Sequence, residues 1–194
     1  PDHPLVGELG AAVERIWGGP YSPPEVRFVE ADITTLVIDA IVNAANTELA
    51  GGAGVCGAIF SAAGWADMQQ ACDALGGCAV GAAKTTPGFD LPATWVIHAV
   101  GPMWRGGSRG EEEQLRSAYR AALDEADRVG ARAVAFPLLS SGIYGYPADE
   151  ACRVAVETLT TSPTHVEQIV IVAFDADRAA TVERYLDDAR GPAD

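Results

Sequence analysis

The chain has 194 residues, of which 48% are hydrophobic and 21% are charged, an ordinary balance for a globular protein. This length predicts a single domain, residues 1–194, with a substantial core. No apolar run is long enough to span a membrane, and the first residues lack a basic-then-apolar signal pattern. The net charge of −14 opposes contact with nucleic acid phosphates, so we expect neither membrane nor duplex binding.

The cysteine pattern argues against a metal site. The four cysteines, Cys56, Cys72, Cys78 and Cys152, form no C-x-x-C pair and no other metal-ligand spacing. We therefore expect reduced thiols, a cytoplasmic location and no metal. A monomer without a cofactor is a separate expectation.

The predicted elements alternate between strands and helices. In chain order they are a helix at 5–17 within an N-terminal extension of residues 1–24, strands at 26–30 and 39–43, helices at 55–63 and 65–75, strands at 81–86 and 95–100, a helix at 111–129, a strand at 133–136, a helix at 148–160, a strand at 169–174 and a helix at 177–189. The βα spacing predicts a layered α/β fold with a mainly parallel sheet. The polar, glycine-rich loop at 105–110 is expected to be exposed and mobile.

A glycine-rich turn between a buried strand and a helix is the most informative stretch. Gly51, Gly52 and Gly54 permit tight bends and a close ligand approach, and the following helix N-terminus offers free N–H groups to an anion. No Lys or Arg occurs from residue 43 to 64 or from 133 to 150, so a pyrophosphate would be held mainly by backbone N–H groups. The G-x-G-x-x-G match at 52–57 lacks the strand immediately before it that a dinucleotide fold requires.

Several motifs in the same order resemble the macrodomain family, which binds ADP-ribose. They are Ala-Asp-Ile-Thr at 31–34, Asp-Ala-Ile-Val-Asn-Ala-Ala-Asn at 39–46, the glycine turn, the segments at 84–88 and 96–102, and Ser-Ser-Gly-Ile-Tyr-Gly-Tyr-Pro at 140–147. The resemblance spans roughly residues 26–187 and is closest to the MacroD-type hydrolases. It implies a three-layer α/β/α sandwich with a mixed, mostly parallel central sheet.

The resemblance also implies where adenine and the distal ribose bind. Asp32 is expected to accept a hydrogen bond from the adenine amino group, with Ile33 beside it and Phe174 stacked on the ring. A turn-capping role for Asp32 and a core role for Phe174 are the alternatives. Asn46 is expected to orient the distal ribose, whereas Asn43 ties down its own loop.

Two loops are expected to enclose the pyrophosphate. The first supplies Gly52, Gly54, Val55 and Cys56, and the second supplies Ser140, Ser141, Gly142, Ile143 and Tyr144. Backbone N–H groups of the second loop would bind phosphate oxygens, and the Tyr144 ring would cover the distal ribose. We assign the reaction itself to Asn46, Gly142 and Tyr144.

Cys56 is where the chain departs from the hydrolase pattern, because those hydrolases carry an aspartate at this position. A thiol is mostly protonated at pH 7 and is a poor substitute base. We interpret Cys56 as a small packing residue, and a nucleophilic role favoured by the helix N-terminus is the alternative. Phe60, which replaces a histidine common in that subgroup, and His98 are expected in the core.

The predicted function is hydrolysis of the ester that links mono-ADP-ribose to acidic protein side chains. O-acetyl-ADP-ribose offers the same ester and is a second candidate substrate. The expected partners are ADP-ribose and mono-ADP-ribosylated proteins. The competing hypotheses are a module that binds ADP-ribose without cleaving it and a phosphatase for ADP-ribose 1″-phosphate.

Overall fold

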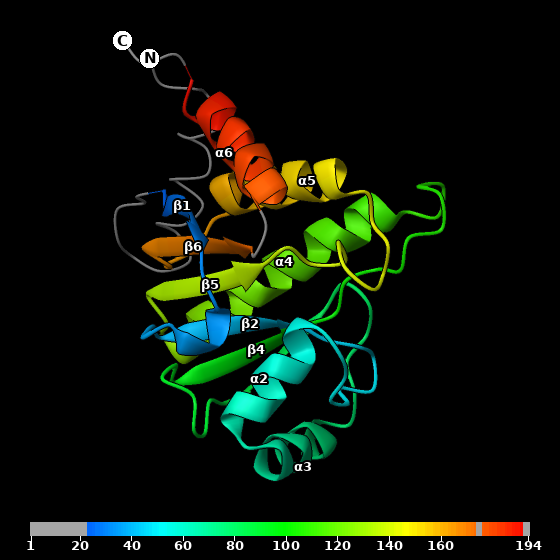
Figure 1. Ribbon diagram of the computed structural model, residues 1–194, viewed down its shortest axis with the longest axis vertical. Coiled ribbons are helices and arrows are strands. Elements are labelled where there is room, and N and C mark those ends of the chain that lie inside the picture. The colour runs from blue at the N-terminus through cyan, green and yellow to red at the C-terminus, as the bar shows by residue number, and fades with distance from the viewer. Residues whose placement is uncertain (1–22, 174–175, 192–194) are drawn as a thin grey trace.

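The computed structural model of the chain describes residues 23–173 and 176–191 (Figure 1). The helix predicted at 5–17, most of the extension at 1–24, and Phe174 lie outside these residues. Within the described part of the chain, none of the helices is both long and apolar enough to cross a membrane.

The centre of the fold is one mixed sheet of six strands. The strands, in the spatial order of the sheet, are β1 (Glu25–Glu30), β6 (Gln168–Ala173), β5 (Ala133–Pro137), β2 (Ala40–Ala44), β4 (Trp95–Ala99) and β3 (Ala83–Pro87). The first five run parallel, and β3 is antiparallel to β4 at the edge. This confirms the mixed, mostly parallel sheet.

Helices cover both faces of the sheet, which confirms the three-layer sandwich (Figure 1). The described helices are the short 3-10 helix η1 (Ile33–Thr35), α2 (Val55–Ala63), α3 (Trp65–Leu75), α4 (Glu111–Val129), α5 (Ala148–Thr161) and α6 (Ala176–Arg190). Helices α2 and α3 pack on one face, and α4, α5 and α6 form the other layer.

Alternation along the strands divides the core into two clusters, one on each face. Val42, Ile97 and Phe136 pack toward α4 and α5, whereas their chain neighbours Ile41 and Val96 pack toward α2 and α3. Side chains of successive strand residues point to opposite faces, and a strand that is covered on both faces is apolar throughout. The strands appear as continuous apolar runs in the sequence because helices cover both faces of the sheet.

The topology gathers several loops at one edge. Because β1, β6, β5, β2 and β4 run parallel, the segments that follow them leave from the same side of the sheet. Ligands of open α/β sheets bind at this edge. The glycine turn follows β2, the Ser-Ser-Gly loop follows β5, and α6 follows β6.

The loop at 105–110 is exposed as predicted, but it is anchored rather than unsupported. The Glu111 carboxylate accepts backbone N–H bonds from Arg105 at 3.1 Å, Gly107 at 3.3 Å and Arg109 at 2.6 Å. The Glu111 residue is only 2% exposed. Burial opposes ionisation of this carboxyl, but the N–H bonds outweigh it, so the pKa of Glu111 is lowered. The sequence pattern showed polarity and glycines but not this anchor.

His98, on β4, is a core residue as predicted and is fully buried. Its Nδ1 lies 3.1 Å from Nδ2 of Asn43, and its Nε2 lies 2.9 Å from Oγ1 of Thr86. Burial disfavours the charged imidazolium and lowers the pKa of His98 to about 4.

We expect His98 to make stability fall as the solution is acidified. The unfolded chain, in which the histidine pKa is about 6.5, binds more protons than the folded chain between pH 6.5 and pH 4. The contribution of His98 to the free energy of unfolding is therefore fully present above pH 6.5 and is lost toward pH 4. Between pH 7 and pH 4.5 the free energy of unfolding should fall by about 2 to 3 kcal/mol. Urea unfolding of the wild type and of His98→Gln at both pH values measures it. Equal pH slopes for the two proteins would contradict the assignment.

Candidate functional site

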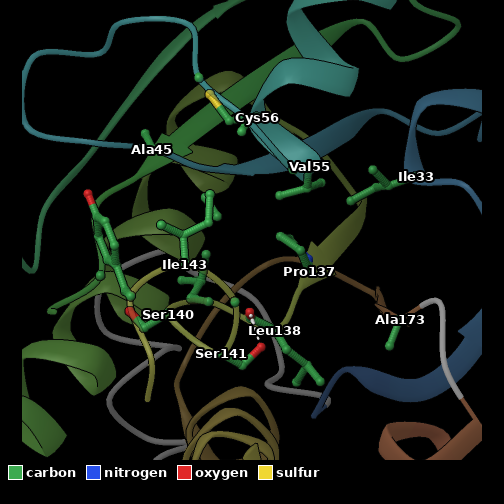
Figure 2. Close-up of a pocket in the computed structure, with 18 of the residues that line it drawn as sticks. Ile33, Ala45, Val55, Cys56, Pro137, Leu138, Ser140, Ser141, Ile143 and Ala173 are labelled. Carbon is green, nitrogen blue, oxygen red and sulfur yellow. Dashed lines mark hydrogen bonds between the residues drawn. The ribbon is translucent and has the colours of Figure 1, made fainter. Parts of the chain in front are cut away.

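A cavity of about 480 Å³ lies at the edge of the sheet where the parallel strands end. Figure 2 shows Ile33 and Ala173 toward one side, Cys56 and Ala45 toward another, and Val55 and Pro137 between them. Its lining comprises Ile33, Ala44, Ala45, Asn46, Gly52, Ala53, Gly54, Val55, Cys56, Gly101, Pro137, Leu138, Leu139, Ser140, Ser141, Gly142, Ile143, Tyr144, Val172, Ala173 and Arg178. All predicted site residues except Asp32 and Phe174 are therefore brought together.

The first wall is the glycine turn and the start of α2. Gly54 is the N-cap with φ of +65°, a left-handed value that favours glycine. The backbone N–H groups from Gly52 to Cys56 make no hydrogen bond to any residue that the structure describes. Together with the positive end of the helix dipole, they form an anion-binding surface.

Gly57 explains how the turn stays close to its helix. A Cβ at Gly57 would lie 2.4 Å from the backbone oxygen of Gly52, so no larger residue fits without a shift. A Cβ at Gly52 itself would meet only the sulfur of Cys56, at 4.0 Å. Gly57 thus serves packing, whereas Gly52 leaves its space to the cavity.

The second wall is the loop from Leu138 to Tyr146. It is braced by the Tyr119 hydroxyl, which accepts the Leu139 N–H at 2.9 Å, and by the Tyr146 N–H, which binds the Ser140 oxygen at 3.0 Å. Ser140 has φ of +63°, an uncommon conformation for a residue with a side chain, and its buried Oγ is without a hydrogen-bond partner in the described structure. Strain of this kind is characteristic of binding sites.

The N–H groups of this second loop are also unused. Those from Ser141 to Tyr144 donate to no residue within the described ranges. Ile143 is 77% exposed, and Figure 2 shows it and Ser140 across the cavity from Val55 and Cys56. Two sets of free donors on opposite walls suit a ligand with negative charge near its centre.

Arg178, near the start of α6, was not predicted and lines the cavity. It is the one charged side chain among the described lining residues, and its Nη2 donates to the Ser141 oxygen at 3.2 Å. The sequence expectation concerned only the two loops, which contain no Lys or Arg, and Arg178 belongs to neither of them. The sequence did offer a signal: a helix that follows a parallel strand starts at the edge of the sheet where the cavity lies, and Arg178 is near the start of such a helix.

Asn46 and Asn43 make hydrogen bonds that the sequence did not show. Asn46 lines the cavity, but its amide also closes the turn: its Nδ2 donates to the Ala50 oxygen at 2.9 Å, and its Oδ1 accepts the Ala50 N–H at 3.0 Å. One donor hydrogen and one lone pair of Asn46 are left for a ligand. Asn43, predicted to tie its loop, is buried, and its amide nitrogen contacts both His98 and Cys56.

Cys56 lies in the first turn of α2, at the wall of the cavity. Its sulfur accepts from Asn43 Nδ2 at 3.6 Å and donates to the Ala50 oxygen at 3.8 Å. These weak contacts and its burial agree with a packing role, and they place no general base beside the thiol. All four cysteines are free and buried.

On the side of the cavity away from Cys56, Ile33 lines the cavity but the neighbouring Asp32 does not (Figure 2). Asp32 caps η1, since its Oδ1 accepts from Thr34 N at 2.9 Å and from Thr34 Oγ1 at 2.7 Å. Asp32 therefore has the capping role given as the alternative, and its Oδ2 accepts no hydrogen bond from a described residue. The expected stacking of Phe174 concerns a residue outside the described ranges.

Tyr144 lines the cavity, as do Gly101 and Asn46. Its backbone oxygen accepts the Trp104 N–H at 2.9 Å, which joins the second loop to the segment after β4. Burial, with a smaller contribution from the negative charge of Glu48, raises the pKa of the Tyr144 hydroxyl above its usual value. The hydroxyl is therefore neutral at physiological pH and can only donate or accept hydrogen bonds.

Comparisons with known proteins agree on one family. The profile of the Macro domain matches residues 42–155. A macro domain-containing protein of Ralstonia nicotianae is 48% identical, over 85% of this chain and 96% of the relative. An O-acetyl-ADP-ribose deacetylase of Klebsiella pneumoniae is 46% identical, over 84% and 95%. A solved mutant of the Oceanobacillus iheyensis macrodomain with ADP-ribose (ADPR) is 32% identical with a TM-score of 0.83, covering 90% of this chain and 98% of that one.

Proposed function

This chain belongs to the macrodomain family, and from that premise we propose that it binds ADP-ribose and hydrolyses esters of its distal ribose. The substrates we propose are proteins with mono-ADP-ribose on acidic side chains, together with O-acetyl-ADP-ribose. O-acetyl-ADP-ribose is the substrate in the name of the Klebsiella pneumoniae relative.

The observation that carries the proposal is the pair of opposed loops with unused N–H groups. Gly52 to Cys56 and Ser141 to Tyr144 present donors from two sides of one cavity, and Arg178 adds one cation. A pyrophosphate is the ligand that such a clamp fits. Adenine then lies toward Ile33 and Ala173, and the distal ribose lies toward Asn46 and Cys56.

The reaction needs a water molecule but no covalent intermediate. Water adds to the ester, the bond between the acyl group and the ribose oxygen breaks, and ADP-ribose and a carboxylic acid leave. Asn46 orients a ribose hydroxyl, Tyr144 covers the sugar, and Gly142 leaves room for the phosphates. No carboxylate from the described residues lines the cavity, so we assign activation of the water to the substrate's own pyrophosphate, which accepts its proton and returns it to the departing ribose oxygen.

A second candidate is a module that binds ADP-ribose without cleaving it. The specific observation in its favour is Cys56, which stands where the MacroD-type hydrolases carry an aspartate. Its contacts with Asn43 and Ala50 are those of a packing residue. The clamp itself serves binding and hydrolysis equally well. No feature of the described residues favours the phosphatase hypothesis.

Release of ADP-ribose separates these functions. The protein is incubated with O-acetyl-ADP-ribose, with glutamate-linked mono-ADP-ribosyl protein and with serine-linked mono-ADP-ribosyl protein, and free ADP-ribose is followed by chromatography. We expect release from the two esters and none from the serine linkage, which is not an ester. Binding of ADP-ribose with no release from either ester would favour the second candidate.

A further inference from the structure

A second cavity of about 370 Å³ adjoins the first at its ribose end. The two cavities share Gly101 and Tyr144, and the second also contacts Thr47, which directly follows Asn46. A group attached to the distal ribose would leave the first cavity on this side. The second cavity is thus the recess available to whatever the ribose is attached to, an argument that rests on the proposed function.

The second cavity is lined by two arginines, Arg105 and Arg109, that form no ion pair with any described residue. Seven described arginines, from Arg116 on α4 to Arg190 on α6, form ion pairs with Asp or Glu. Arg105 and Arg109 form no ion pair with any described residue, although the chain has 27 acidic residues and only 13 basic ones. Both arginines are exposed and line this cavity.

Glu111 also lines the cavity, but its carboxylate is directed to the backbone. It accepts the N–H groups of Arg105, Gly107 and Arg109, and it therefore fixes the shape of the loop that carries both arginines. The Trp104 N–H bond to the Tyr144 oxygen fastens the same segment to the first cavity. The two guanidinium groups are thus carried by a constrained loop rather than a free one.

Apolar groups complete the surface. Met103 is 53% exposed and Val80 is 43% exposed, and both line the second cavity. Exposed apolar side chains next to two arginines without ion pairs form a surface suited to an acidic peptide, since peptides contribute both carboxylates and apolar side-chain atoms. A net charge of −14 would otherwise repel an acidic target, so local positive charge is needed where it docks.

We propose that the second cavity binds the acidic segment of the modified protein that flanks its ADP-ribosylated residue, through Arg105 and Arg109. Substrates would then be chosen by two adjoining sites. The first recognises ADP-ribose itself, and the second favours acceptor residues that lie among other Asp and Glu residues. O-acetyl-ADP-ribose, with only an acetyl group beyond the ribose, would not use the second site.

Binding of stable peptides tests this without depending on catalysis. Two serine-linked mono-ADP-ribosyl peptides, one with Asp and Glu flanks and one with Ser and Gly flanks, are titrated into the wild type and into Arg105→Gln/Arg109→Gln. We expect the double variant to bind the acidic peptide about five to ten times more weakly, in keeping with exposed charge pairs. Its affinity for the neutral peptide and for ADP-ribose should change less than about twofold.

The control variant is Arg27→Gln/Arg120→Gln, which removes the same charge from residues that do not line the second cavity. It should leave the affinity for the acidic peptide within about twofold of the wild type, because neither residue lines the cavity and exposed charges are screened by salt. Equal weakening by both double variants, or no weakening by either, would overturn the proposal while leaving ADP-ribose binding intact. Failure of the wild type to bind ADP-ribose would instead overturn the proposed function and this inference together.

Discussion

Gly52→Glu should abolish ADP-ribose binding and leave the fold intact. A Cβ at this position has the sulfur of Cys56 at 4.0 Å as its nearest neighbour, and the backbone is not in the left-handed region, so the chain accommodates a side chain. The glutamate would carry a negative charge into the space proposed for the pyrophosphate. Juxtaposed like charges cost several kcal/mol, so the affinity should fall by about a hundredfold or more.

Calorimetric titration with ADP-ribose and a thermal melt of the same samples measure both effects. Gly52→Ala is the matched control, because its methyl group fits the same free space without charge. It should retain the melting temperature and most of the affinity. Unchanged binding in Gly52→Glu, with an unchanged melting temperature, would show that the glycine turn is not the phosphate site.

Asn46→Ala should lower ester hydrolysis much more than Cys56→Ala does. The Asn46 amide both faces the cavity and holds Ala50 through two hydrogen bonds, so its loss removes a ribose contact and loosens the turn. We expect kcat/KM to fall by about 10- to 100-fold for Asn46→Ala and by less than about tenfold for Cys56→Ala.

Release of ADP-ribose from the glutamate-linked substrate, followed with each variant, provides the comparison. ADP-ribose affinity is measured in parallel, so that a loss of binding is distinguished from a loss of chemistry. If Cys56→Ala lost all activity and still bound ADP-ribose, the thiol would be a catalytic group. Near-normal kcat/KM in Asn46→Ala would remove this amide from the mechanism.

The sequence predicted the fold well because its signals are local and strong. Apolar runs such as 169–173 permit only a strand covered on both faces, and the amphipathic helix at 111–129 has buried residues on one stripe. The predicted bounds differ from the observed ones by at most two residues, and the helices at 55–63, 65–75 and 111–129 coincide with them. The strand predicted at 81–86 begins only at Ala83, because Gly81 is in a left-handed conformation with φ of +82°.

The site was predicted only in part, because some contacts join residues far apart in the chain. The two glycine-containing loops were recognisable from their residue types. Arg178 was not, since its position in the cavity depends on where α6 starts relative to β6. The anchoring of the loop at 105–110 by Glu111 was also missed. Acidic residues are common in the first turn of a helix, where they interact favourably with the helix dipole, so Glu111 did not stand out from its neighbours.

A crystal structure of the wild-type protein with ADP-ribose tests the central claim most directly. We predict a pyrophosphate between the N–H groups of Gly52 to Cys56 and those of Ser141 to Tyr144, with adenine at Ile33 and the distal ribose at Asn46. The ribose hydroxyl that carries the ester should then point toward the second cavity, beside Tyr144. A ligand bound outside the first cavity, or one with its adenine at Asn46, would contradict the account.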